Sequence, residues 1–182
     1  MTRTKIPWAT HSWNPVSGCD PVSDGCKFCY AREIATRFKG TDAFPFGFDV
    51  TINRSRLNDP ILLKKPAIIF TVSMGDLFHK EVSSATIYDV IATIQEAPRH
   101  QFVILTKRPE RAERILGERI SDIPPNLWLG ISAENQETLE QRWAALSPLR
   151  DYHSVISLEP LLEPVNLWRL NPQPSWVIVG GA

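Results

Sequence analysis

The sequence has few cysteines, and all of them lie in one short stretch. There are three in 182 residues, between positions 19 and 29. An odd and clustered count is a poor basis for a disulfide framework, which argues against a small secreted scaffold. Ligation of a metal ion or an iron–sulfur cluster is the better interpretation of these thiols.

The sequence also lacks net charge and long apolar runs. Its 20 basic and 20 acidic residues cancel, so no global field attracts nucleic acid or an anionic membrane, although a local basic patch is compatible with this balance. No uninterrupted apolar stretch reaches the roughly 18 residues that a membrane-spanning helix needs. Residues 1–8 lack the apolar core of a secretion signal. We therefore expect a cytoplasmic protein with no membrane partner.

The composition is that of an ordinary globular protein, with 43% hydrophobic and 22% charged residues. The length fits one compact domain over residues 1–182, and no internal repeat is present. Five apolar runs of strand length recur along the chain, at residues 67–72, 102–105, 127–131, 154–158 and 176–179. They are continuously apolar, which is typical of parallel strands buried on both faces. Weaker patterns predict two earlier strands, at 12–17 and 48–52.

Helical patterns with start and stop signals lie between the apolar runs. Three such segments extend from Ser83 to Pro98, from Pro109 to Gly117, and from Asn135 to Pro148. Repeated strand–helix units with right-handed crossovers predict an α/β fold, either a barrel or an open doubly wound sheet.

Polar residues and glycines gather where the apolar runs end. They are Ser73, Asp76, Thr106, Lys107, Arg108, Glu134, Asn135, Glu159, Gly180 and Gly181. In a (β/α) barrel the carboxyl ends of all strands converge on the face that carries the chemistry, whereas an open sheet uses one switch point. The repeated polar ends favour a partial (β/α) barrel, in which Asp76, Lys107, Glu134 and Glu159 point into one cavity near the cysteines. The alternative is that polar residues simply begin loops.

The cysteines form the pattern Cys19-x6-Cys26-x2-Cys29. Thiolates are soft ligands that suit zinc or iron–sulfur clusters. Three thiolates on a [4Fe–4S] cube leave one iron open, as in a reactive site. A zinc site completed by a histidine such as His11 or His79, and a set of inert thiols, are the alternatives. The apolar residues Tyr30, Ile34 and Phe38 then predict an amphipathic helix, which places the motif in a strand–helix loop.

The aromatic Phe28 directly before Cys29 resembles the second half of the radical S-adenosylmethionine (radical SAM) signature, although the first gap has six residues where the superfamily usually has three. The chain also resembles a family of phage and bacterial proteins of unknown function, from near residue 5 to the end. The matching stretches are 13–19, 25–31, 73–79, 105–110, 129–135, 157–162 and 176–181.

The resemblance implies a TIM-like radical SAM barrel in which Cys19, Cys26 and Cys29 hold a [4Fe–4S] cluster. It also implies an enzyme that takes electrons from a donor, cleaves SAM, and acts on an unknown substrate. A phage context suggests nucleic acid or a nucleotide, which the neutral charge does not support. By charge complementarity, Asp76 and Glu159 would bind the SAM ribose or ammonium, and Lys107 or Arg108 its carboxylate. The other expected cofactor-binding residues are Phe28, Glu134, Gly180 and Gly181.

The rival function is a non-catalytic zinc or iron–sulfur interaction module, or a truncated relic. Members of the resembling family usually continue beyond the Gly180-Gly181 pair, so we expect a C-terminally incomplete barrel. An apolar last strand at 176–179 without a covering helix would need a missing C-terminal segment or a partner chain.

Overall fold

The computed structural model describes residues 1–119, 123–149 and 152–180, so the predicted site residue Gly181 lies outside the described part of the chain. The strands are β1 (Thr2–Arg3), β2 (His11–Trp13), β3 (Val16–Ser17), β4 (Thr51–Ile52), β5 (Ile68–Thr71), β6 (Gln101–Thr106), β7 (Leu127–Ser132), β8 (His153–Leu158) and β9 (Trp176–Val179). The α-helices are α1 (Tyr30–Arg37), α2 (Asp59–Leu62), α3 (Ser84–Glu96), α4 (Pro109–Gly117) and α5 (Gln136–Leu146). Short 3-10 helices are η1 (Asp24–Phe28), η2 (Arg54–Arg56) and η4 (Leu167–Arg169). In this part of the chain, no helix has both the length and the hydropathy that crossing a bilayer requires.

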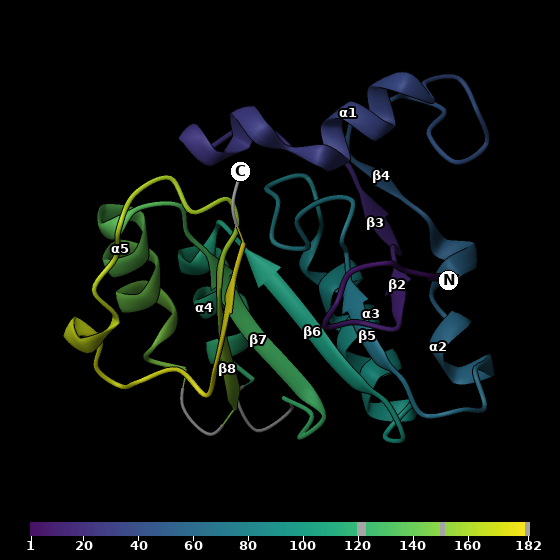
Figure 1. Cartoon of the computed structure of the whole chain (residues 1–182). Helices are drawn as coiled ribbons and strands as arrows, with labels where there is room; N and C mark the ends of the chain where they lie inside the picture. The colour runs from purple at the N-terminus through teal and green to yellow at the C-terminus, as the bar shows by residue number, and fades with distance from the viewer. Residues whose placement is uncertain (120–122, 150–151, 181–182) are drawn as a thin grey trace.

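The fold is α/β, and its main sheet is mostly parallel. Its seven strands have the order β1-β2-β5-β6-β7-β8-β9. β1 pairs antiparallel with β2, and every later pair of neighbours is parallel. The chain thus advances across the sheet without reversing, with α3, α4 and α5 as crossovers (Figure 1). A doubly wound sheet would reverse direction at a switch point. The described strands form an open sheet with edges at β1 and β9, and no closed barrel is formed.

The hydrophobic core lies between one face of this sheet and the three crossover helices. The strand register places Ile69, Phe102 and Leu127 in one row across β5, β6 and β7, and all three are fully buried. The same cluster contains Ile87, Val90 and Ile94 of α3, Ala112 and Ile115 of α4, and Leu139, Trp143 and Leu146 of α5. Burial of this apolar stripe from each helix holds the strands in register, and the register positions the strand ends that form the site.

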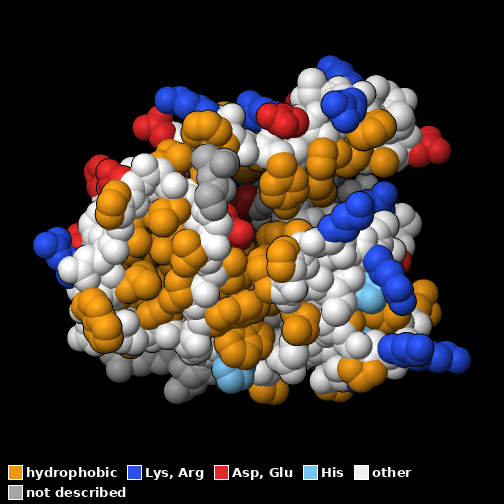
Figure 2. Space-filling view, viewed as in Figure 1, with side chains coloured by type: hydrophobic (Ala, Val, Ile, Leu, Met, Phe, Trp, Pro, Cys, Tyr) orange, Lys and Arg blue, Asp and Glu red, His pale blue; other side chains and the backbone are white. Residues whose placement is uncertain are grey.

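The opposite face of the sheet has no crossover helix and is lined by aromatic side chains. The Trp8 indole, from the segment before β2, lies 4.8 Å from the Phe70 ring of β5 and 5.7 Å from the Trp176 ring of β9, measured between ring centroids. In a flat sheet those two strands would be about 19 Å apart. Contact of both with one indole therefore requires a strongly curved sheet. Figure 2 shows hydrophobic side chains on this face, and the register also places Val103 of β6 and Val155 of β8 there, both of which are buried. The prediction that the strands are buried on both faces is therefore correct at these central positions, while Trp128 and Trp176 remain partly exposed.

The short elements near the N-terminus differ from the sequence prediction. The expected strand at 12–17 is divided into β2 and β3, with Pro15 between them, because proline has no N–H for a sheet hydrogen bond. The expected strand at 48–52 shortens to β4, which pairs antiparallel with β3 in a separate two-stranded sheet. Strand β1 and helix α2 have no counterpart in the sequence prediction because they are too short to show periodicity.

Helix α1 occurs where the sequence predicts an amphipathic helix. Tyr30, Ile34 and Phe38, whose spacing indicated this helix, are 48%, 39% and 48% exposed. The buried residues of α1 are Ala31 and Ala35. Small side chains let this helix pack closely, and Ile34 and Phe38 remain exposed on its other side.

Candidate functional site

A pocket of about 170 Å³ lies at the carboxyl edge of the parallel sheet, beneath the cysteine loop and α1. Its wall includes all three cysteines with Phe28 and Tyr30, and residues at or after the ends of β5 to β8, among them Asp76, Lys107, Arg108, Ser132 and Glu159. Figure 2 shows a hollow with acidic side chains at its floor. A larger cavity of about 680 Å³ lies beside α5, but its described lining contains no cysteine, histidine or carboxylate. Reactive groups therefore gather at the smaller pocket.

The loop after β5 is held against the cysteine loop by direct backbone contact. Val72 has a left-handed φ of 60°, which is unfavourable for a β-branched residue, and its amide donates to the Trp13 carbonyl at 2.7 Å. The Gly18 amide donates to the Met74 carbonyl at 2.8 Å. A Cβ on Gly75 would lie 2.7 Å from the Gly18 carbonyl oxygen, so this approach requires glycine. The strained turn is typical of functional sites and positions Cys19 beside the end of β5.

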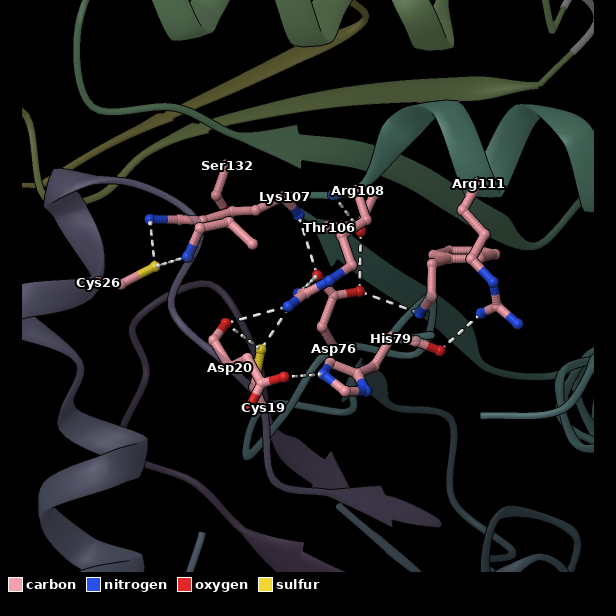
Figure 3. Close-up of polar contacts among 12 residues, drawn as sticks. Cys19, Asp20, Cys26, Asp76, His79, Thr106, Lys107, Arg108, Arg111 and Ser132 are labelled. Carbon is pink, nitrogen blue, oxygen red and sulfur yellow. Dashed lines mark hydrogen bonds and ion pairs between the residues drawn. The ribbon is translucent and has the colours of Figure 1, made fainter. Parts of the chain in front are cut away.

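Asp76 and Arg108 form a buried ion pair that contacts Cys19. Arg108 Nη1 lies 2.9 Å from Asp76 Oδ2 and 3.1 Å from Cys19 Sγ, to which it donates (Figure 3). Asp76 also accepts from the Thr106 hydroxyl at 2.8 Å and from the Lys107 amide at 3.1 Å. With four donors around it, counting the Phe78 amide, this carboxylate is held in one orientation.

Glu134 and Lys107 form a second ion pair, which contacts Cys26. Lys107 Nζ lies 3.3 Å from Glu134 Oε2. It also lies 3.8 Å from Cys26 Sγ (Figure 3). Arg142 of α5 supplies another cation to Glu134 at 3.0 Å. A Cβ on Gly25 would lie 2.9 Å from Lys107 Nζ and 3.0 Å from Glu134 Oε2, so glycine in the cysteine loop leaves room for this pair.

Glu159 has fewer partners than the other two carboxylates. Its side chain is exposed and accepts from the Ser157 hydroxyl at 2.9 Å. A Cβ on Gly180 would lie 2.7 Å from Glu159 Oε1, so Gly180 serves by giving this side chain space. Across the pocket, the Tyr30 hydroxyl donates to the Ser73 carbonyl at 2.7 Å.

The cysteine loop is also fastened through Asp20. His79 Nε2 lies 3.1 Å from Asp20 Oδ2, and the Glu81 amide donates to His79 Nδ1 at 3.2 Å (Figure 3). Since Nδ1 accepts, Nε2 carries the proton and donates a hydrogen bond to Asp20. Arg111 donates to the His79 carbonyl at 2.7 Å and so holds the loop that carries this histidine.

The environments of the thiols differ. Burial and the charge of Asp76 raise the pKa of Cys19 to about 11, although Arg108 opposes that shift. Burial acts to raise the pKa of Cys26 as well, but the Val22 amide and the Lys107 ammonium hold it below its ordinary value. The thiolate form is the metal ligand and the nucleophile, so Cys26 is the thiol with the more favourable surroundings for either role.

The prediction that strand-end residues share one cavity with the cysteines holds for three of the four residues named for it. Asp76, Lys107 and Glu159 line the same pocket as the cysteines and Phe28, as expected. Glu134 is not part of the lining, because it is fully buried and turned to Arg142 and Lys107. Arg142, Asp20 and Tyr30 were not predicted as site residues. The cysteine pattern does not specify the residue type at Asp20 or Tyr30, and Arg142 reaches the site from a helix face outside any motif.

The pocket offers three thiols as possible ligands for a metal group. Within the described ranges, no three Cys, His, Asp or Glu side chains are gathered closely enough to hold a metal ion as they stand. His79 is fully buried and bonded to Asp20, and neither His11 nor His79 lines the pocket. Three soft thiols on one short loop, with cationic donors at the sulfurs of Cys19 and Cys26 and an amide donor at Cys26, nevertheless have the chemistry that an iron–sulfur cluster requires.

Comparison with known proteins adds a family to this description. A family model described as "Protein of unknown function (DUF5131)" matches residues 3–182, which include the three cysteines and every strand end that lines the pocket. No curated protein and no solved structure matches the chain. The chain belongs to this family of proteins of unknown function.

Proposed function

We propose that the protein is a radical SAM type iron–sulfur enzyme in which Cys19, Cys26 and Cys29 hold a [4Fe–4S] cluster. The observation that carries the proposal is that three thiols share a pocket with strand-end residues from β5, β6, β7 and β8, and that its described lining contains no fourth cysteine and no histidine. A structural metal site normally has four protein ligands, whereas a reactive site keeps one position open. When bound, the cluster would supply the electron that cleaves SAM.

The shape of the sheet supports a partial barrel of this type. The parallel strands advance in one direction, and Trp8 bridges β5 and β9 across the uncovered face. In a (β/α) barrel the loops after the strands carry the catalytic groups. The pocket occupies that position here, and the cysteine loop lies above it.

The partners of each carboxylate suggest how the pocket residues divide their roles. Asp76 and Glu134 are already bonded to internal cations, so their proposed contacts with SAM would be indirect. Glu159 is exposed in the pocket and is the best placed to accept from the SAM ribose or ammonium. Lys107 and Phe28 line the same wall and could contact the remainder of SAM.

Binding of SAM and of a cluster would require two changes in the shape of the pocket. The volume of about 170 Å³ is below the roughly 300 Å³ at which ligand pockets usually begin, so binding SAM would require the cysteine loop and α1 to move outward. The cluster would in turn draw the three sulfurs together. A reducing cytoplasmic compartment would keep the thiols free, and an electron donor and a substrate of unknown class would complete the system.

The proposal is tested by electron paramagnetic resonance of the anaerobically reconstituted and reduced protein, with and without SAM. SAM at an open iron should change the spectrum of the reduced cluster, and 5′-deoxyadenosine should form under reducing conditions. Glu159→Gln should weaken the response to SAM while leaving the cluster intact. Gln141→Ala, on the exposed side of α5, is the matched control. A reduced-cluster spectrum indifferent to saturating SAM would refute the assignment.

A further inference from the structure

Two consecutive residues at the end of β6 each contact a different cysteine sulfur. Lys107 Nζ lies 3.8 Å from Cys26 Sγ, and Arg108 Nη1 lies 3.1 Å from Cys19 Sγ. β6 is a central strand, so its end lies under the middle of the pocket. The two side chains diverge toward opposite ends of the cysteine loop.

A buried carboxylate from a neighbouring strand end holds each cation. Asp76 follows β5 and pairs with Arg108, and Glu134 follows β7 and pairs with Lys107. The carboxylate side chains are 6% and 1% exposed. Each acid offsets much of the charge of its cation. Each cation therefore acts on its sulfur mainly through a fixed N–H hydrogen bond, and less through its net positive charge.

The burial of Lys107 and Arg108 strengthens their hydrogen bonds to the cysteine sulfurs. The side chains of Arg108 and Lys107 are 15% and 17% exposed, so water competes weakly for their N–H groups. A hydrogen bond in such surroundings is electrostatically stronger than one in water. Both contacts also limit where the two sulfurs can move, which a purely surface ion pair would not do.

Hydrogen bonds to ligand sulfur are one of the means by which a protein sets the potential of an iron–sulfur cluster. We propose that Lys107 and Arg108 are positioning residues that raise the reduction potential of the group held by Cys26 and Cys19, an inference that rests on the proposed function. Donation to sulfur withdraws electron density and favours the reduced, more negative state. Asp76 and Glu134 then act by holding these donors in place.

The test is the midpoint potential of the reconstituted cluster, measured without SAM by anaerobic redox titration. Lys107→Met and Arg108→Met should each shift the midpoint to more negative values. The expected effect is a reduced-to-oxidised ratio about tenfold lower at the wild-type midpoint, which for one electron corresponds to about 59 mV. Lys107→Arg and Arg108→Lys keep a cationic donor but change its geometry at sulfur, so each should shift the midpoint in the same direction by a smaller amount. Lys65→Met, an exposed lysine outside the pocket, controls for the loss of one charge.

The outcomes separate this inference from the function on which it rests. A cluster that assembles in the wild type and keeps its potential in both methionine variants overturns the tuning role alone. A wild-type protein that takes up no iron and sulfide overturns both. If a methionine variant does not fold, the conservative pair decides, because a change in donor geometry at sulfur should still move the midpoint relative to Lys65→Met.

Discussion

At the scale of single residues, Glu134 is a buried carboxylate held between two cations. It is fully buried and lies between Lys107 at 3.3 Å and Arg142 at 3.0 Å. Burial acts to raise the pKa of Glu134, but hydrogen bonds from Ser23 and Arg142 and the charge of Lys107 hold it below its ordinary value. The ionised form is therefore the one that the fold stabilises.

Glu134→Gln should destabilise the protein strongly, since it leaves two buried cations without their carboxylate. The expected loss in the free energy of unfolding near neutral pH is about 3 kcal/mol. Urea denaturation measures it, with Glu137→Gln on the exposed surface of α5 as the control. A loss no larger than that of the control would show that the buried pair contributes little.

The stability lost in Glu134→Gln should depend on pH. Because the pKa of Glu134 is lower in the folded than in the unfolded state, its contribution to stability is present above about pH 4.5, the ordinary glutamate value, and is lost as the pH falls through the folded pKa. The difference in unfolding free energy between wild type and Glu134→Gln should therefore narrow below that pH. A difference that stays constant down to the acid transition would contradict the lowered pKa.

At the scale of helices and strands, the sequence signals that worked were long apolar runs and capping residues. All five apolar runs became strands β5 to β9, and Ser83 and Asn135 cap α3 and α5 as predicted. For α1 the sequence predicted an amphipathic helix but did not settle which residues face the sheet. A helical stripe of large apolar residues normally faces a core, but α1 packs through Ala31 and Ala35, and which neighbour allows such close packing is decided by the tertiary structure.

Asn135 offers a direct test at this scale. Its side chain accepts from the Thr138 amide at 2.9 Å, and the Thr138 hydroxyl accepts in return from the Asn135 amide at 3.3 Å, which together form a capping box. Asn135→Ala should lower the free energy of unfolding by about 1 kcal/mol. Thermal denaturation beside Gln141→Ala, expected to change stability by less than about 0.5 kcal/mol, measures it. Equal effects of the two substitutions would argue against the cap.

At the scale of the whole molecule, the strand-end rule predicted where the candidate site lies. It did not predict which of its side chains form ion pairs with each other. Carboxyl ends of parallel strands meet at one edge, which is why Asp76, Lys107 and Glu159 could be grouped in advance. Which cation pairs with which acid depends on strand adjacency, and adjacency is a tertiary fact. Arg142 reaches the site from a helix and Asp20 from within the cysteine loop, and no motif specifies the residue type at either position.

The curvature of the sheet is a further property of the whole molecule that a variant can probe. Trp8 contacts β5 and β9 through Phe70 and Trp176. Trp8→Ala should therefore reduce the free energy of unfolding by about 2 kcal/mol, less than for a fully buried tryptophan. Trp168→Ala is the matched control, because that side chain is 90% exposed and should tolerate the change within about 0.5 kcal/mol. Similar unfolding midpoints for the two variants would show that the bridge across the sheet is weak.

The central claim is that Cys19, Cys26 and Cys29 hold an iron–sulfur cluster, and its most direct test is the iron and acid-labile sulfide content after anaerobic reconstitution. The account predicts about four irons and four sulfides per chain, as three thiolates on one cube require. Cys26→Ala should lose them, while Gln141→Ala should retain them. Tight binding of about one zinc, with no sulfide and no visible absorbance, would contradict the account and identify the loop as a zinc site.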